Sequence, residues 1–177
     1  MTEKNLLVSF KFFSDVQPEI LEKIARKAEV LTLKPDDVIF RFDEPAAHLY
    51  GVLEGEVGLS VVFKDKVLKT EIEYEEAIQA SIVEEEKSIV VDKVQSGQVF
   101  GWASLVGPGR RTVTAHCIGA ARIIALPASE LRAMLEEDNA LGYIIMKRMS
   151  DIISKRLKKR TETLIETWVE TFGIDEI

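Results

Sequence analysis

The chain has 177 residues and a formal net charge of −7, and 46% of its residues are hydrophobic. This hydrophobic share is enough for a buried core and excludes a chain that is disordered throughout. The acidic balance argues against a general nucleic-acid surface, because phosphate binding requires clustered cations. The length fits one domain with a helical appendage, which we divide into residues 1–139 and 140–177.

Cysteine and histidine are too few for a disulfide or a metal site. Cys117 is the only cysteine, and His48 and His116 lie far apart without acidic partners at metal-site spacing. Barrel enzymes of the cupin type need several histidines and a carboxylate on one metal, so we expect neither an enzyme nor a metal cofactor. The N-terminus lacks the features of a secretion signal and no apolar run reaches membrane-spanning length, which predicts a cytoplasmic protein without a membrane partner.

The first predicted element is a short amphipathic helix over residues 18–30, with Pro18 in its first turn. Between residues 31 and 126, short apolar runs alternate with turn residues, which predicts strands. These runs are LTL, DVIFRF, HLYGVL, EVGLSVVF, SIVVDKV, RTVTAHC and ARIIAL. Many short strands at this spacing predict a sandwich or barrel, mainly β with flanking helices.

Residues 71–86, EIEYEEAIQASIVEEE, contain seven glutamates and neither lysine nor arginine. Their apolar residues fit both the period of a strand and the period of a helix, so the pattern does not decide between the two. We expect an acidic insertion between two strands, exposed to solvent. A contact surface for a basic partner is the alternative.

Two helices are predicted after Pro127. The first, PASELRAMLEED, has Ser129 as its candidate N-cap. The second is much longer and runs from about residue 140 to residue 170. Its apolar stripe has to be buried, either on the chain's own sandwich or against a second copy, and we favour a homodimer through residues 140–170.

The stripe of the long helix is wide and is interrupted by charge. Its main track consists of Leu141, Ile145, Met149, Ile152, Arg156 and Lys159, and it is widened by Ile144, Ile153, Leu157, Leu164, Ile165 and Trp168. The helix also holds the only basic cluster, which consists of Lys155, Arg156, Lys158, Lys159 and Arg160. We interpret this cluster as a solvated helix face and expect no direct contact with nucleic acid.

The segment GQVFGWASLVGPGRRTVTA, residues 97–115, has the composition of an anion-binding loop. Gly101 and the small residues that follow it allow backbone N–H groups to approach a ligand closely. Arg111 comes after a Gly-Pro-Gly turn and leads into a strand, where its guanidinium would complete a phosphate clamp. An exposed hairpin turn with solvated arginines is the alternative that this local pattern leaves open.

The same segment resembles the phosphate-binding cassette of the cyclic-nucleotide-binding domain, which catabolite activator (CRP/FNR) regulators and cyclic-nucleotide-dependent kinases share. The family pattern is Phe-Gly-Glu, small residues with Leu, a variable loop, and Arg followed by Ala, Ser or Thr. Phe100-Gly101, Leu105 and Arg111-Thr112 match this pattern. Residues 36–57 and ARIIALPASELRAML are similar to the family's first strands and to its last strand with the next helix, so the resemblance covers about residues 10–160.

The resemblance implies a double-stranded β-helix, or jelly roll, followed by a long C-terminal helix. It implies that Arg111 pairs with a cyclic phosphate, that Thr112 adds a hydroxyl, and that the backbone N–H groups of Ala103 and Ser104 bind the same anion. The implied ligand is a cyclic nucleotide (cAMP or cGMP) or a similar anionic small molecule. The expected ligand-binding residues are Phe100, Gly101, Trp102, Ala103, Ser104, Arg111 and Thr112, whereas Arg110 is expected to be solvated.

Trp102 departs from the family, which has at this position a glutamate that accepts the ribose 2′-hydroxyl. An indole has one N–H donor and no acceptor. A buried hydroxyl left unpaired costs about 1–3 kcal/mol, or roughly tenfold to more than a hundredfold in affinity. The ligand therefore stays open between a cyclic nucleotide, another anionic or nucleotide-like ligand and an empty, degenerate pocket.

These observations predict a free-standing regulatory module that binds an anionic ligand and signals to a partner through its C-terminal helix. Catabolite activator regulators continue into a helix-turn-helix domain, and TFGIDEI is too short and too acidic to be one. One alternative is a scaffold protein with a degenerate pocket. Another is the effector half of a transcription regulator whose DNA-binding part is a separate chain.

Overall fold

Two antiparallel sheets form the body of the protein. The computed structural model describes residues 3–74, 77–106 and 109–173, with the backbone alone described for 3–5, 66–74 and 77–84. The first sheet has the strand order β1-β8-β3-β6 and the second has the order β2-β7-β4-β5. The strands are β1 Glu29–Leu33, β2 Val38–Phe40, β3 His48–Glu54, β4 Glu56–Tyr74, β5 Ala77–Gln95, β6 Val99–Phe100, β7 Thr114–Cys117 and β8 Ala121–Pro127.

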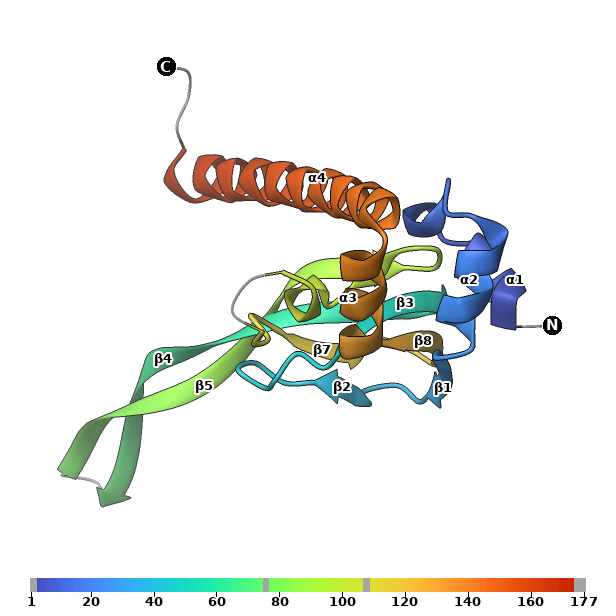
Figure 1. Ribbon diagram of the computed structural model, residues 1–177. Coiled ribbons are helices and arrows are strands. Elements are labelled where there is room, and N and C mark those ends of the chain that lie inside the picture. The colour runs from blue at the N-terminus through green and yellow to red at the C-terminus, as the bar shows by residue number, and fades with distance from the viewer. Residues whose placement is uncertain (1–2, 75–76, 107–108, 174–177) are drawn as a thin grey trace.

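Helices flank the sheets at both ends of the chain (Figure 1). The N-terminal elements are α1 Glu3–Val8, the 3-10 turn η1 Lys11–Phe13 and α2 Pro18–Ala25. A second 3-10 turn, η2 Trp102–Ser104, follows β6, and α3 Ala128–Glu137 and α4 Asn139–Phe172 follow β8. This arrangement confirms the predicted class, mainly β with flanking helices, a β-roll and a long C-terminal helix.

The first sheet is covered on both faces, and this explains its unbroken apolar sequences. Along β8, Ile123 packs into a core between the two sheets, while Ile124 packs into a second core under the helices. On β3, Val52 packs into the core between the sheets and Leu49 packs into the core under the helices. Because successive side chains of a strand point to opposite faces, a strand buried on both faces reads as a continuous apolar run rather than an alternating one.

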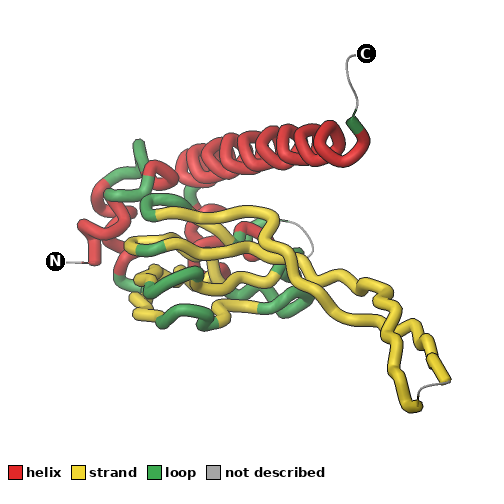
Figure 2. The backbone as a smooth tube through the Cα atoms, turned by 180° about the vertical axis from the view of Figure 1, so that it is seen from behind, coloured by secondary structure: helices red, strands yellow, loops and turns green. Residues whose placement is uncertain are grey.

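β4 and β5 pair far beyond the sheet and project as a two-stranded ribbon (Figures 1 and 2). The pairing continues to Ile72 opposite Ile78. The backbone of residues 71–74 and 77–86 is therefore strand. Of the two structures that the sequence pattern of this acidic segment left open, strand and helix, it adopts the strand. The structure does not describe residues 75–76 or the side chains of residues 66–84. The predicted role of the glutamates in this acidic segment therefore lies outside the described residues.

Two of the predicted element boundaries at the helices are wrong. The helix predicted for residues 18–30 ends at Ala25, because a turn follows in which the N–H of Ala28 bonds the carbonyl of Ala25, and β1 then pairs with β8 from Glu29 onward. The predicted N-cap Ser129 lies inside α3, which begins at Ala128 with Pro127 in the cap position and no side-chain cap.

The strand predicted from Arg111 begins only at Thr114. The backbone N–H of Arg111 donates to the carbonyl of Glu44, and its own carbonyl accepts from the N–H of Asp43. These bonds hold Arg111 against the loop after β2. The arginine therefore belongs to a loop-to-loop contact rather than to the ladder of β7.

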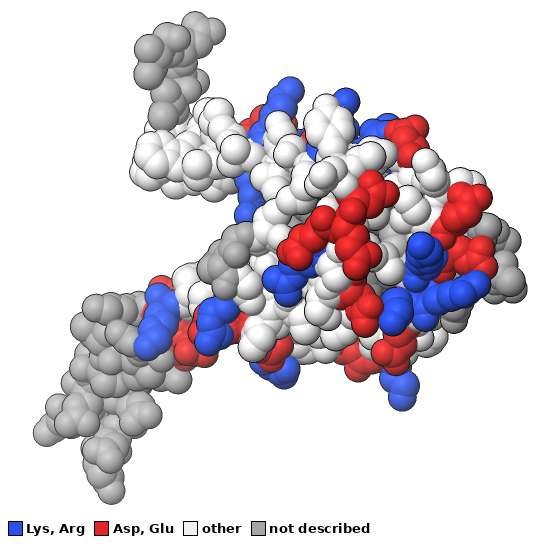
Figure 3. All heavy atoms as spheres, viewed as in Figure 1, with Lys and Arg blue, Asp and Glu red and all other residues white. Residues whose placement is uncertain are grey.

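The side chains that α4 buries all lie in its first half, and polar contacts of Arg156 and Lys159 fix its middle to the body. Asp138 caps its start, accepting from the N–H groups of Ala140 and Leu141, and Leu141 and Met149 are buried beneath it. The stripe is thus buried on the chain's own body along the first half, which is the interpretation that the sequence analysis set beside the favoured homodimer. The far half projects from the body, and on the face shown in Figure 3 its end is covered mainly by uncharged side chains. None of the described helices is both long and apolar enough to span a membrane.

Candidate functional site

A left-handed glycine opens the turn in which the predicted site lies. β6 ends at Phe100, and Gly101 then adopts φ +79° before the chain enters η2. A Cβ atom on Gly101 would lie 2.7 Å from Nη1 of Arg111 and 3.2 Å from Cδ2 of Tyr50. Glycine is therefore required twice, for the backbone conformation and for the close approach of the arginine.

Arg111 is buried beside this turn, and its guanidinium is fixed by backbone oxygens and aromatic rings. The residue is 3% exposed. Nη1 donates to the carbonyl of Gly101 at 2.9 Å and Nη2 donates to the carbonyl of His48 at 2.8 Å. The guanidinium carbon lies 4.1 Å from the ring centroid of Phe40 and 5.5 Å from that of Tyr50. The arginine is thus held in one orientation before any ligand binds.

The charge of Arg111 lacks a counter-ion within the described part of the chain. None of the described carboxylates lies within ion-pair distance of it, and its Nε is buried without a hydrogen-bond partner. Burial lowers the pKa of Arg111, but a guanidinium stays protonated in proteins. Carbonyl dipoles, ring faces and the charge of Glu44, which lies beyond ion-pair distance, balance this buried cation. A buried charge without a direct partner is costly, and an anion would relieve that cost.

An aromatic stack forms the floor under Arg111. The rings of Tyr50 and Phe100 stack at 5.3 Å, and the rings of Phe40 and Phe100 stack at 6.1 Å. Burial raises the pKa of the Tyr50 hydroxyl, although the nearby charge of Arg111 opposes this shift. Phe100 is 0% exposed and lies in the core, so it supports the floor from behind rather than facing a ligand.

A small pocket of about 50 Å³ lies at this turn. Five of the seven predicted site residues line it, namely Gly101, Trp102, Ala103, Arg111 and Thr112. Ser104, like Phe100, lies behind the wall: it is 1% exposed, and its backbone N–H donates to the carbonyl of Gly101 at 3.2 Å. The structure therefore brings most of the predicted set together around one cavity.

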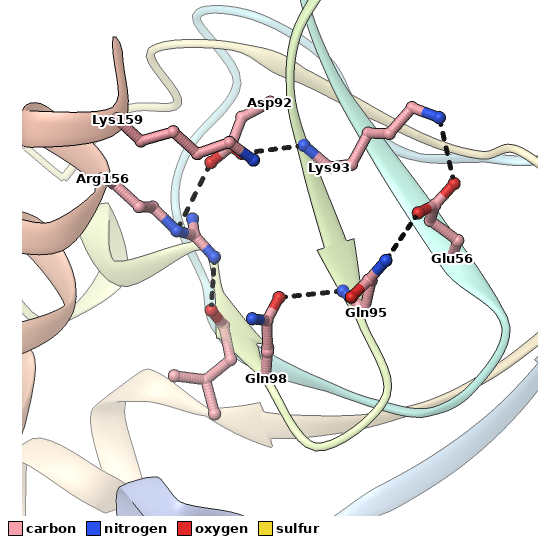
Figure 4. A network of polar contacts seen from close by, with 8 residues as sticks. Glu56, Asp92, Lys93, Gln95, Gln98, Arg156 and Lys159 are labelled. Atoms are coloured by element: carbon pink, nitrogen blue, oxygen red, sulfur yellow. Dashed lines mark hydrogen bonds and ion pairs between the residues drawn. The ribbon is translucent and has the colours of Figure 1, made fainter. Parts of the chain in front are cut away.

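Arg156 of α4 also lines the pocket, a role that the sequence analysis did not predict. Its guanidinium carbon lies 4.6 Å from the ring centroid of Trp102, and Nη2 donates to the carbonyl of Val99 at 2.9 Å. Its Nε lies 3.4 Å from Oδ2 of Asp92 on β5, a residue that a chain of polar contacts connects to Glu56 (Figure 4). Burial lowers the pKa of Arg156, whereas Asp92 raises it. One side chain thus connects α4 to β5, to β6 and to the turn.

The prediction that the basic cluster of α4 is a solvated face is therefore wrong for Arg156. Its side chain is 13% exposed, whereas the side chain of Lys158 is 80% exposed. The available signal was its position, because Arg156 continues the buried stripe of Leu141, Ile145 and Met149. A charged residue on the buried face of a helix requires a partner inside the protein.

A larger cavity, of about 230 Å³, lies on another side of Arg156. It opens between η1, the turn before β6 and α4, and its walls include Phe12, Gln98 and Ile152. Of the residues that line this cavity, Val99 and Arg156 also take part in the hydrogen bond described above. None of the predicted site residues lines it, so this cavity and the pocket at Gly101 are separate features.

The fold and the cassette are similar to those of the cyclic-nucleotide-binding domain. Solved structures of this class match most of the chain, which confirms the resemblance. A protein from Geobacter metallireducens GS-15, provisionally described as cyclic nucleotide-binding, is 27% identical, with 89% of this chain and 98% of that chain covered and a TM-score of 0.66.

Two more distant structures show the same fold. The catabolite activator protein of Thermus thermophilus is 18% identical, with 90% of this chain and 63% of that chain covered and a TM-score of 0.58. The regulatory domain of a Toxoplasma gondii protein kinase, solved with cAMP, is 16% identical, with 89% and 49% covered and a TM-score of 0.55. No protein-family model and no curated protein sequence matches the chain.

Proposed function

We propose that the protein is a regulatory module that binds a cyclic nucleotide or another anionic small molecule at the pocket beside Arg111. The observation that supports this most directly is the buried guanidinium of Arg111, which has no carboxylate partner among the described residues and an unused Nε–H. An arginine has five N–H donors, and two of them are used by carbonyls here. The remaining donors suit a phosphate, which arginine binds through paired hydrogen bonds.

Binding of a ligand of nucleotide size requires the pocket to widen. Its present volume is about 50 Å³, whereas small-molecule pockets ordinarily measure roughly 300–1,000 Å³. Trp102 and Arg156 are the wall residues that separate most simply, because they belong to different elements and meet only through a ring face. Widening the pocket would release one contact of α4, which couples the ligand to the position of this helix.

Calorimetric titration with cAMP and with cGMP tests the proposed ligand site. We expect heat with at least one of them in wild-type protein, and a loss of affinity of tenfold or more in Arg111→Lys, because an ammonium cannot reproduce the paired hydrogen bonds. Arg110→Lys is the matched control, since Arg110 is exposed and pairs with Asp43 instead. Equal affinity of Arg111→Lys and wild type would remove Arg111 from the site.

The fluorescence of Trp102 is a second test of ligand binding, and it does not require an Arg111 variant that folds. The chain has two tryptophans, so Trp168→Phe leaves Trp102 as the only one. We expect the ligand to change its emission, because Arg156 leaves the indole face. Emission that stays constant at a saturating ligand concentration would contradict the proposed widening.

We also propose that the far half of α4 pairs with a second copy of the chain. Leu157, Leu164, Trp168 and Phe172 are between 55% and 66% exposed and recur along one side of the helix. An apolar stripe of this length on a projecting helix requires a cover. A second copy supplies the same stripe and would bury both at once.

The small pocket favours one further candidate, an interaction protein without a ligand. In that case Arg156 would close the pocket permanently and α4 would act as a docking helix. Titrations that give no heat, together with a dimer in solution, would select this candidate over the first.

A further inference from the structure

The pocket contains a second cationic end, which α4 supplies. Arg156 and Arg160 line the same pocket as Arg111, together with Trp102. Aspartate and glutamate are absent from the lining residues that the structure describes. The charged side chains at the wall are therefore all arginines, although the protein as a whole is acidic.

The charge of Arg156 is only partly balanced. Its Nε lies 3.4 Å from Oδ2 of Asp92, yet this oxygen has no hydrogen-bond partner, and neither does the buried Nη1 of Arg156. Lys159 also approaches Asp92, with Nζ 3.8 Å from Oδ1, so two cations share one carboxylate. The guanidinium therefore retains a donor that no described group uses, and Arg156 is one of the residues that line the pocket.

The groups at this end donate hydrogen bonds but accept none. An indole has only its N–H, and a guanidinium has only N–H donors. A sugar hydroxyl placed there would leave its own O–H without an acceptor from Trp102 or Arg156, which is costly in a buried site. Phosphate and carboxylate oxygens only accept, so they fit these donors completely.

We infer that the end of the pocket formed by Trp102, Arg156 and Arg160 binds a second anionic group of the ligand. This inference rests on the proposed function, in which Arg111 binds the first anionic group. The ligand class is then a compact molecule with two anionic groups, such as two linked phosphates or a phosphate and a carboxylate. The second anionic group competes with Asp92 for Arg156. Because Asp92 lies on β5 and Arg156 on α4, this competition weakens the contact between the two elements.

Calorimetry of the full chain with inorganic pyrophosphate, inorganic phosphate and cAMP tests this inference. We expect pyrophosphate to bind wild-type protein about tenfold or more tightly than phosphate, because it reaches both cationic ends. Arg156→Gln is expected to lower the affinity for pyrophosphate about tenfold to a hundredfold and to leave the affinity for phosphate nearly unchanged. Arg160→Gln, at an exposed position that is safe for folding, is expected to act in the same direction with a smaller effect.

Lys158→Gln is the matched control, because it removes one positive charge from the same helix at a side chain that is 80% exposed. We expect its affinity for pyrophosphate to stay within about twofold of wild type, since solvent and salt screen an exposed charge. Equal losses in Arg156→Gln and Lys158→Gln, or pyrophosphate no tighter than phosphate, would overturn the inference.

The outcomes separate this inference from the function on which it rests. If Arg111→Lys weakens cAMP binding while Arg156→Gln and Arg160→Gln leave pyrophosphate binding unchanged, the proposed function stands and the second anion site does not. If Arg111→Lys changes the affinity for none of the three probes, or if none binds to wild-type protein, the proposed function fails and the inference fails with it.

Discussion

The guanidinium of Arg156 stacks on the indole of Trp102, with 4.6 Å between the guanidinium carbon and the ring centroid. This contact joins the longest helix of the protein to the turn that contains the candidate site. Trp102 is also the residue at which the sequence departs from the cyclic-nucleotide-binding cassette. The residue that departs from the family pattern, Trp102, is therefore covered by a second unusual residue, Arg156, which lies on the buried face of α4.

Gly101→Ala is expected to destabilise the protein more than Gly109→Ala. Both glycines have positive φ, so each substitution incurs a conformational cost of about 1–2 kcal/mol. Only at Gly101 does the new Cβ also meet Nη1 of Arg111, at 2.7 Å, which adds about 1–3 kcal/mol of overpacking. Urea unfolding of both variants measures the difference. Equal losses of unfolding free energy would show that Arg111 moves aside without cost.

The contact between Asp92 and Arg156 is expected to contribute more than the shorter surface pair of Arg122 and Glu54. The first pair is nearly buried, with side chains 5% and 13% exposed, although its N–O distance is 3.4 Å. The second pair lies at 2.6 Å, but its side chains are 41% and 64% exposed. A double-mutant cycle should give about 1–3 kcal/mol for the buried pair and less than about 1 kcal/mol for the exposed one.

Only part of this site was predictable from the sequence. Strands β1, β3 and β8 of the first sheet follow from their apolar runs, and the turn at Gly101 follows from local composition, because both signals lie within a few neighbouring residues. The floor of Phe40 and Tyr50 under Arg111 was not predicted, since it depends on which strands face each other. The same applies to Asp92 and Arg156, which are distant in the chain and meet only once α4 has packed on the body.

Leu164→Lys is expected to weaken self-association, whereas Glu166→Lys is expected to leave it unchanged. Both variants introduce a lysine in the same region of α4, but on different faces of the helix. Leu164 is 57% exposed and belongs to the apolar stripe. Light scattering after size-exclusion chromatography measures the mass of each variant. A wild-type protein that is monomeric at high concentration would contradict the proposed pairing.

Stability is expected to fall above about pH 9. Burial raises the pKa values of the Cys117 thiol and the Tyr50 hydroxyl in the folded protein. The unfolded chain loses these protons first, near its ordinary pKa values of about 8.5 for cysteine and about 10 for tyrosine. The stabilisation from these protons is thus complete below those values and is lost as the pH rises through the folded pKa values.

Urea unfolding at pH 8 and at pH 10 measures this dependence. We expect Tyr50→Phe to reduce the loss of stability between the two values, because the variant has no hydroxyl to ionise at this position. Tyr143→Phe, at a residue that is 68% exposed, is the control and should retain the wild-type dependence. A Tyr50→Phe variant with the same dependence as wild type would attribute the alkaline loss to other groups.

Trp102→Glu is expected to exchange one ligand preference for another. A carboxylate at this position accepts a sugar hydroxyl, and such a hydrogen bond to a charged group contributes about 1.5–3 kcal/mol, or roughly tenfold to a hundredfold in affinity for cAMP. The same carboxylate next to Arg156 neutralises the second cationic end, so the affinity for pyrophosphate should fall. Trp102→Leu, which removes the indole without adding an acceptor, is the control and should not gain affinity for cAMP. Calorimetry of both variants with cAMP and pyrophosphate measures this exchange. If Trp102→Glu bound pyrophosphate as tightly as wild type, the binding of an anion by Arg156 would not depend on the residue beneath it.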